Sequence, residues 1–256
     1  MKHMYGWHQV SCLLLGAWLL AGCAGPAVKP EADLNRAEHY VARGRTYLDE
    51  GLYDRAIADY TQALALNPNH TEAYNNRGVA YYLRGDYRHA IADFTQVLVL
   101  YPDSAEAYSY RGEAYRREGD YDHAIQDYSQ AIRLKPDFVE VYVNRGVTYH
   151  RMRDHERAIA DFTQALVLDP NLPRAYYNRG NAYLDKRDYD RAIADYTQAL
   201  SLHPNYTEAY NNRAVARFHK EEYDQAWGDV QQVQQSGGTP HPAFIEALRS
   251  ASGRQE

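Results

Sequence analysis

A single pattern of residues recurs every 34 positions over most of this 256-residue chain. A fixed period of this length is the signature of a repeat architecture, in which one unit is too small to bury a core alone and must stack on its neighbours. The chain must therefore fold as an array. Six units follow one another without a gap, at residues 37–70, 71–104, 105–138, 139–172, 173–206 and 207–240.

Within each unit, two sets of positions have the spacing of a helical packing face. Position 4 is tyrosine in all six units, and position 8 is glycine in five units and Ala214 in the last. Position 20 is always alanine, and position 24 is aromatic except for Val230. Such spacing predicts two amphipathic helices per unit. Pro68 and its equivalents in the next four units should end the second helix.

The run Thr71-Glu-Ala-Tyr-Asn-Asn-Arg-Gly-Val-Ala-Tyr81, followed by Gly85, Tyr87, Ala90, Phe94, Val97 and Pro102, resembles the tetratricopeptide repeat. The resemblance implies an all-α fold, a right-handed α-solenoid of six helix pairs. Residues 241–256 should form a capping helix and a tail, since Phe244, Ile245 and Leu248 share one helical face after Pro242.

The first 22 residues have the layout of a secretory signal peptide, with Lys2 ahead of an apolar run that ends at Leu20. Leu20-Ala21-Gly22-Cys23 resembles the lipobox of bacterial lipoproteins, which implies a lipidated Cys23. Ala24 at the next position implies sorting to the outer membrane, facing the periplasm by default, with cell-surface exposure left open. Residues 23–36 should be the lipidated cysteine and a flexible tether, so the membrane contact is through the lipid anchor only.

The composition argues against several other functions. A net charge of −6 disfavours nucleic acid as a partner, and Cys12 and Cys23 are the only cysteines. We find no catalytic motif, so we expect neither an enzyme nor a cofactor. His150 and His155 flank a predicted turn and could meet at a metal ion. Because no companion ligand appears at metal spacing, we interpret them as polar turn residues and predict no metal site.

Arginine at position 7 and aspartate at position 23 occur in every unit, each just off the packing face of its helix. We expect them to meet as structural ion pairs, although a role in ligand binding is the alternative. The two rows are Arg43, Arg77, Arg111, Arg145, Arg179 and Arg213, and Asp59, Asp93, Asp127, Asp161, Asp195 and Asp229.

Positions 2, 6, 9 and 13 point away from the packing face of the first helix, and the resemblance implies that this face lines a concave groove. Position 6 and position 13 supply the candidate peptide- or protein-binding residues, Asn76, Tyr110, Asn144, Asn178 and Asn212 with Arg117 and Arg151. Amides can hydrogen-bond the main chain of an extended partner, as in the asparagine ladder that this row resembles, and the arginines would favour an acidic group. Duplication of an unused residue is the competing explanation.

These features predict a membrane-anchored interaction scaffold or adaptor of the bacterial envelope, which binds an extended peptide or protein segment in its groove. The alternative is a structural component that assembles with copies of itself in pilus, secretion or cell-wall machinery.

Overall fold

The structure is a computed structural model that describes residues 31–254. This part of the chain contains thirteen α-helices and no strand. The helices are α1 (Glu31–Asp49), α2 (Tyr53–Leu66), α3 (Thr71–Arg84), α4 (Tyr87–Leu100), α5 (Ala105–Glu118), α6 (Tyr121–Leu134), α7 (Val139–Arg151), α8 (His155–Leu168), α9 (Pro173–Asp185), α10 (Tyr189–Leu202), α11 (Thr207–His219), α12 (Tyr223–Gln235) and α13 (Pro242–Ser252). The expected signal peptide, Cys23 and most of the expected tether lie outside the described residues.

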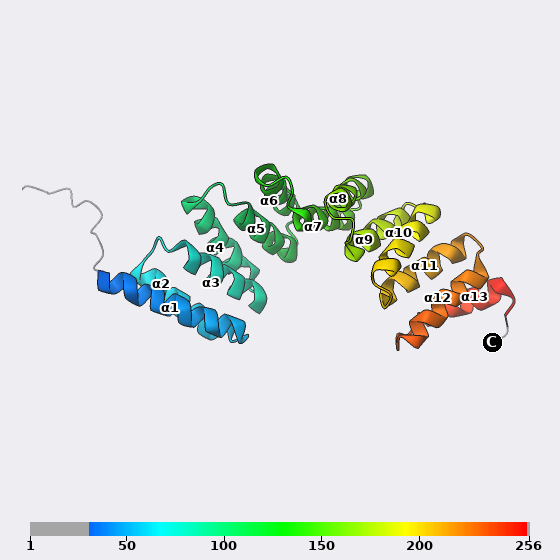
Figure 1. The fold of residues 1–256 in the computed structure, drawn as a ribbon, viewed down its shortest axis with the longest axis horizontal. Helices are drawn as coiled ribbons and strands as arrows, with labels where there is room; N and C mark the ends of the chain where they lie inside the picture. Colours follow the sequence, from blue (N-terminus) through cyan, green and yellow to red (C-terminus); the bar gives the residue numbers. More distant parts are fainter. Residues whose placement is uncertain (1–30, 255–256) are drawn as a thin grey trace, which may run out of the picture.

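The helices form six antiparallel pairs that stack into an arch (Figure 1). Each second helix packs between the first helix of its own pair and the first helix of the next. The first helices also contact one another, in sequence from α1 and α3 to α9 and α11, so they form the closely spaced inner layer. At the centre of the arch, α6 and α8 lie along the top and α7 lies beneath them. The predicted all-α solenoid of six helix pairs is confirmed.

Local sequence signals explain where the helices begin and end. Five of the six second helices end two residues before a proline, as predicted, because proline cannot continue the hydrogen-bond ladder. Four of them begin at an aspartate cap, among them Asp120, whose carboxylate accepts a hydrogen bond from the backbone N–H of His123 at 3.2 Å. These caps were not predicted from the repeat pattern.

Glycine at position 8 lets the two helices of a pair approach closely. A Cβ atom added to Gly146 would lie 2.8 Å from Cε1 of Phe162, and the equivalent contact of Gly180 with Tyr196 would be 2.7 Å. These aromatic rings are fully buried. The sixth pair solves the same packing problem with Ala214 opposite the smaller Val230, both buried. In the sixth unit, position 8 is therefore larger and position 24 smaller than in the other five, so the two differences in volume offset each other.

All six predicted arginine–aspartate pairs form, and the aspartates are between 2% and 6% exposed. In the fourth unit, Nε and Nη2 of Arg145 donate to the two carboxylate oxygens of Asp161, each at 2.8 Å. Hydrogen bonding to the aspartate raises the pKa of the arginine, for example that of Arg111 beside Asp127. This two-point geometry is the strongest form of a charge-assisted hydrogen bond.

Each arginine after the first also reaches back into the preceding unit, which was not predicted. Nη1 of Arg145 donates to the hydroxyl of Ser129 at 2.9 Å, and that hydroxyl donates to the carbonyl of Ile125 at 2.6 Å. Position 25 carries Thr61, Thr95, Ser129, Thr163 and Thr197, and each accepts such a bond from the next unit. The arginines therefore join neighbouring units as well as the two helices of one pair. The recurring hydroxyl was the signal in the sequence.

The two ends of the arch differ in how well the sequence predicts them. Helix α1 begins at Glu31, so residues 31–36, which were assigned to the tether, belong to a helix. Glu31 and Asp33 lie in its first turn, where the helix dipole favours carboxylates. At the other end α13 packs as the predicted cap, with Leu248 fully buried and Phe244 partly buried against Phe218. Among the described helices, none is both long and apolar enough to cross a membrane.

Candidate functional site

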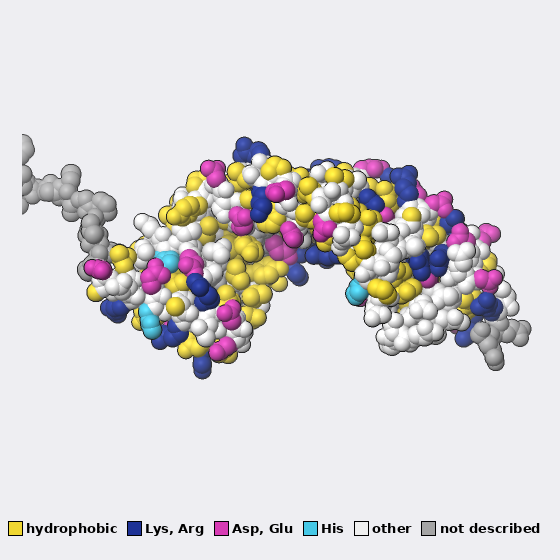
Figure 2. All heavy atoms as spheres, in the orientation of Figure 1, with side chains coloured by type: hydrophobic (Ala, Val, Ile, Leu, Met, Phe, Trp, Pro, Cys, Tyr) yellow, Lys and Arg dark blue, Asp and Glu magenta, His cyan; other side chains and the backbone are white. Residues whose placement is uncertain are grey.

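The inner layer of the arch contains a pocket of about 380 Å³ between the second, third and fourth units. Its lining comes mainly from positions 2, 5, 6, 9 and 13 of the first helices, which agrees with the face predicted for a groove. Hydrophobic side chains gather on the inner edge of the arch over α3 and α5, next to this hollow (Figure 2). The pocket is lined by Val79, Tyr82, Leu83, Phe94, Glu106, Ser109, Tyr110, Glu113, Phe138, Glu140 and Asn144.

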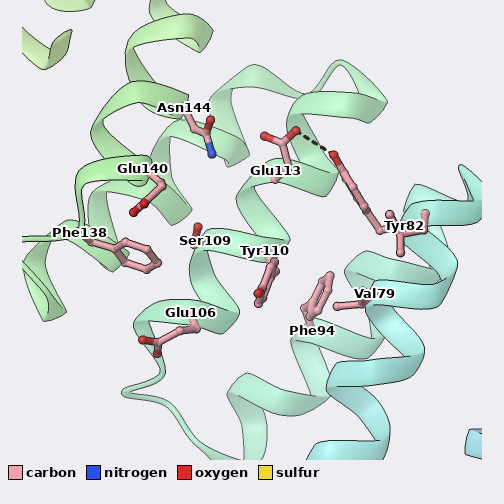
Figure 3. Close-up of a pocket in the computed structure, with 11 residues that line it drawn as sticks. Val79, Tyr82, Phe94, Glu106, Ser109, Tyr110, Glu113, Phe138, Glu140 and Asn144 are labelled. Carbon is pink, nitrogen blue, oxygen red and sulfur yellow. Dashed lines mark hydrogen bonds between the residues drawn. The ribbon is translucent and has the colours of Figure 1, made fainter. Parts of the chain in front are cut away.

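Two aromatic rings form the apolar wall of the pocket. Tyr110 of α5 stacks on Phe94 of α4, with ring centres 5.5 Å apart and planes 18° from parallel (Figure 3). Phe94 is almost fully buried, whereas Tyr110 leaves 47% of its surface exposed. Phe138 lies on the opposite side of the hollow. An exposed aromatic face beside a buried one offers contact area to a large apolar side chain.

Glu113 at position 9 occupies the polar side of the pocket and is already satisfied. Its carboxylate accepts hydrogen bonds from the hydroxyls of Tyr82 and Tyr128, each at 2.9 Å, and from Nε of Arg116 at 2.8 Å. Burial alone would raise its pKa, but these donors, Arg116 first, lower the pKa of Glu113 from 4.5 to about 2. Arg117 also donates to Glu113, at 3.1 Å. Glu113 is thus held ionised, and its carboxylate fixes the positions of the tyrosine and arginine side chains that donate to it.

Two other carboxylates line the pocket, and one of them has no partner among the described residues. Glu106 and Glu140, at position 2 of the third and fourth units, are exposed. Lys135 approaches Glu106 at 3.5 Å, and within the described chain Glu140 forms no ion pair or side-chain hydrogen bond. None of the lining residues is lysine or arginine. The pocket is therefore apolar at its wall and negative at its rim.

The structure brings only some of the predicted groove residues together. Tyr110 and Asn144 line the pocket, on facing helices (Figure 3). The amide of Asn144 forms no side-chain hydrogen bond with the described residues, so its donor and acceptor are both available. Asn178 and Arg151 are likewise without a side-chain partner in the described part of the chain, but they lie outside the pocket.

The remaining predicted residues are engaged within the protein. The amide nitrogen of Asn76 lies 3.5 Å from Glu72 of its own helix. The amide of Asn212 donates to Asn181 at 2.8 Å and to the hydroxyl of Tyr177 at 3.2 Å. Arg117 donates from Nε to the hydroxyl of Tyr82 at 3.1 Å as well as to Glu113. The expected row of equivalent amides is therefore divided into free and committed members.

Comparison with known proteins agrees with this architecture. Sequence profiles described as TPR repeat match residues 112–152 and 154–186, and profiles described as tetratricopeptide repeat match residues 41–105, 173–206 and 195–228. The chain belongs to the tetratricopeptide repeat family. This fold is that of a protein–protein interaction scaffold. The comparison with curated proteins found no match.

Several solved structures share the fold. A crystal structure of MamA protein is 28% identical, covers 68% of this chain and 95% of its own, and superposes with a TM-score of 0.62. PilF of Pseudomonas aeruginosa is 18% identical, covers 88% of this chain and 100% of its own, and has a TM-score of 0.69. YrrB, described as a TPR protein with an unusual peptide-binding site, is 21% identical, covers 70% of this chain and 96% of its own, and has a TM-score of 0.59.

Proposed function

We propose that this protein is a scaffold that holds an extended polypeptide segment along the inner face of its arch. The observation that carries the proposal is the stacked pair of Phe94 and Tyr110, which presents a half-exposed aromatic ring in a concave pocket of about 380 Å³. A large apolar side chain of the partner packs against this ring. Each Å² of apolar surface that it buries contributes about 25 cal/mol.

The charge around the pocket selects a basic neighbour for that side chain. Glu140 stands at the rim without an ion-pair partner among the described residues, and Glu106 is approached at 3.5 Å by the exposed Lys135. A lysine or arginine within one or two residues of the apolar anchor would meet these carboxylates, whereas an acidic residue would be repelled. The acidic partner expected from Arg117 and Arg151 is thus not favoured at the pocket, because Arg117 already neutralises Glu113.

The main chain of the partner is held by polar groups beside the anchor. Asn144 offers a free amide with both a donor and an acceptor, and Ser109 offers a hydroxyl on the facing helix. These groups can hydrogen-bond the backbone of a peptide, and they discriminate little between peptides of different sequence. Specificity therefore comes from the anchor and its basic neighbour.

Selection from a displayed random-peptide library tests this proposal directly. The purified protein should enrich peptides with an aromatic or long aliphatic residue followed or preceded closely by lysine or arginine. Tyr110→Ala should weaken a selected peptide at least about tenfold, or about 1.4 kcal/mol. Glu140→Gln should weaken it less and make binding less sensitive to salt. Val167→Ala is the matched control, because Val167 is 70% exposed on α8 and does not line the pocket.

Two outcomes would contradict the proposal. One is enrichment of acidic peptides. The other is a selected peptide that binds Tyr110→Ala and the parent protein equally well, which would place recognition elsewhere on the array.

The location of the scaffold is a separate part of the proposal. The lipobox around Cys23 supports a lipid anchor in the bacterial envelope, with the arch held at the periplasmic face of the outer membrane. Replacing Cys23→Ala should release the protein from the membrane fraction and remove the mass of the acyl chains. Unchanged fractionation and mass would refute the anchor and leave the peptide-binding proposal intact.

Self-assembly is the competing use of the same surface. Light scattering over a range of protein concentrations separates the two, since a scaffold for another protein stays monomeric while a self-assembling array grows in mass.

A further inference from the structure

The fourth unit differs from the others at one contact between its two helices. Positions 12 and 17 face each other across the turn, as in Tyr82 with Tyr87, whose ring centres are 5.6 Å apart. In the fourth unit the same contact joins His150 and His155, with ring centres 5.3 Å apart. Position 17 is tyrosine in the five other units, at Tyr53, Tyr87, Tyr121, Tyr189 and Tyr223.

The fourth unit is therefore the only one of the six with a histidine on both sides of this contact. Position 12 is Leu48, Tyr82, Arg116, Leu184 and Phe218 in the units that lack the second histidine. A chance polar substitution in this array would change one side of the contact. Here both sides have become the same metal-ligating residue type.

A third ligating group comes from the next unit. The carboxylate of Asp185, the last residue of α9, lies 2.8 Å from Nε2 of His150. One ligating atom from each of His150, His155 and Asp185 can be chosen so that all lie within 4.8 Å of one another. Asp185 is 35 residues from His150 and becomes adjacent only when the units stack, so spacing along the chain does not reveal it as a companion ligand.

His155 supplies an independent indication of a ligand. Its Nδ1 atom is buried and has no hydrogen-bond partner in the structure. A buried polar atom without a partner destabilises a protein by about 1–3 kcal/mol unless something satisfies it. A metal ion held against this nitrogen would do so.

We propose that His150, His155 and Asp185 form a binding site for a divalent transition-metal ion such as Zn²⁺. Two imidazoles and one carboxylate suit zinc, nickel, copper or iron, whereas Mg²⁺ and Ca²⁺ prefer oxygen ligands throughout. Bonds of about 2.0–2.2 Å at tetrahedral angles place ligand atoms about 3.4 Å apart. Nε2 of His150 and the carboxylate oxygen of Asp185, now 2.8 Å apart, must therefore separate slightly, while ligand atoms up to 4.8 Å apart must approach each other. His150 and Asp185 can make these shifts, because their side chains are 27% and 52% exposed.

The site has a defined place in the array. It connects α7 and α8 of the fourth unit to α9 of the fifth, so a bound ion cross-links one boundary between units. Three protein ligands leave at least one coordination position for water or for a side chain of a partner. The site lies outside the Tyr110 pocket and does not depend on the peptide-binding proposal.

Calorimetric titration of the metal-stripped full-length protein with Zn²⁺ tests the site. His155→Tyr is the informative variant, because it restores the residue of the five other units and should preserve the fold. The parent protein should bind one more ion per chain than this variant, with micromolar affinity or tighter, and Zn²⁺ should raise its melting temperature while Mg²⁺ does not. Co²⁺ should give visible ligand-field bands that His155→Tyr abolishes.

His123→Ala is the control for scattered surface imidazoles, since His123 is exposed on α6, where it pairs with Asp120 and stacks on Tyr115. It should keep the stoichiometry and affinity of the parent protein. The proposal is overturned if the parent and His155→Tyr bind the same number of ions. It is also overturned if His123→Ala loses as much zinc as His155→Tyr, because the binding would then be diffuse.

Discussion

The ring of Phe162 fills the space that a side chain on Gly146 would need, since a methyl group on Gly146 would come within 2.8 Å of the ring. The sixth unit fills the equivalent space with Ala214 and Val230. We therefore expect Gly146→Ala alone to destabilise the protein by about 1–3 kcal/mol through overpacking. Phe162→Val alone should also destabilise it, by leaving a cavity.

The double variant should be more stable than the sum of the two single changes predicts, by about 1 kcal/mol or more. Urea unfolding of the four proteins gives this coupling energy. Additive effects would mean that the two residues do not share the space that their positions indicate. Ala214→Gly in the sixth unit serves as the reverse control, because it removes volume opposite a residue that is already small.

The arginine row should contribute unequally along the array. Arg145 is 18% exposed and joins Asp161 to Ser129 of the preceding unit. Arg43 has no preceding unit, and its side chain is 46% exposed. Arg145→Ala leaves a buried carboxylate unpaired and should cost about 3–5 kcal/mol, whereas Arg43→Ala should cost clearly less. Chemical denaturation measures both, and equal losses would show that the bond between units adds nothing.

Glu113 should make stability depend on pH in the acid range. Because its pKa is lowered from 4.5 to about 2 in the folded protein, its ionised form stabilises the fold above about pH 4.5. That contribution is lost as the pH falls from 4.5 towards 2. The melting temperature of Glu113→Gln should therefore lie below that of the parent protein at pH 7 and approach it near pH 3.

A suitable comparison is Glu246→Gln, since Glu246 is exposed on α13 and belongs to no such network. Its small effect on melting should not change over the same range. If the difference between Glu113→Gln and the parent protein stays constant from pH 7 to pH 3, the hydrogen bonds from Arg116, Tyr82 and Tyr128 do not hold the carboxylate ionised.

The sequence predicts most reliably what every unit repeats. Gly146 with Phe162, and Arg145 with Asp161, recur at fixed positions, so periodicity and helical geometry place them together. The capping helix was predictable because Leu248 lies on an apolar helical face, and the last unit is the surface that this face can cover. Helix α1 extends further than expected because charged and apolar residues before position 37 permit either a tether or a helix.

Features that belong to one unit, or to the boundary between two, were not predictable in the same way. Glu113 stands where Val79 stands one unit earlier, and its partner Tyr82 comes from that earlier unit. The sign of the pocket charge depends on which arginine rotamers reach which carboxylates. Arg117 turns towards Glu113, and no pattern in the sequence determines that choice.

The hydroxyl that each arginine reaches in the unit before it has a mechanical consequence. Helix pairs contact only their neighbours. The distance between the two ends of the arch therefore depends on the rotation of one unit relative to the next, added up over the five junctions between units. A hydrogen bond from Arg145 to Ser129 and its equivalents sits at every junction and resists opening. The curvature of the arch is therefore restrained at each junction by the protein itself.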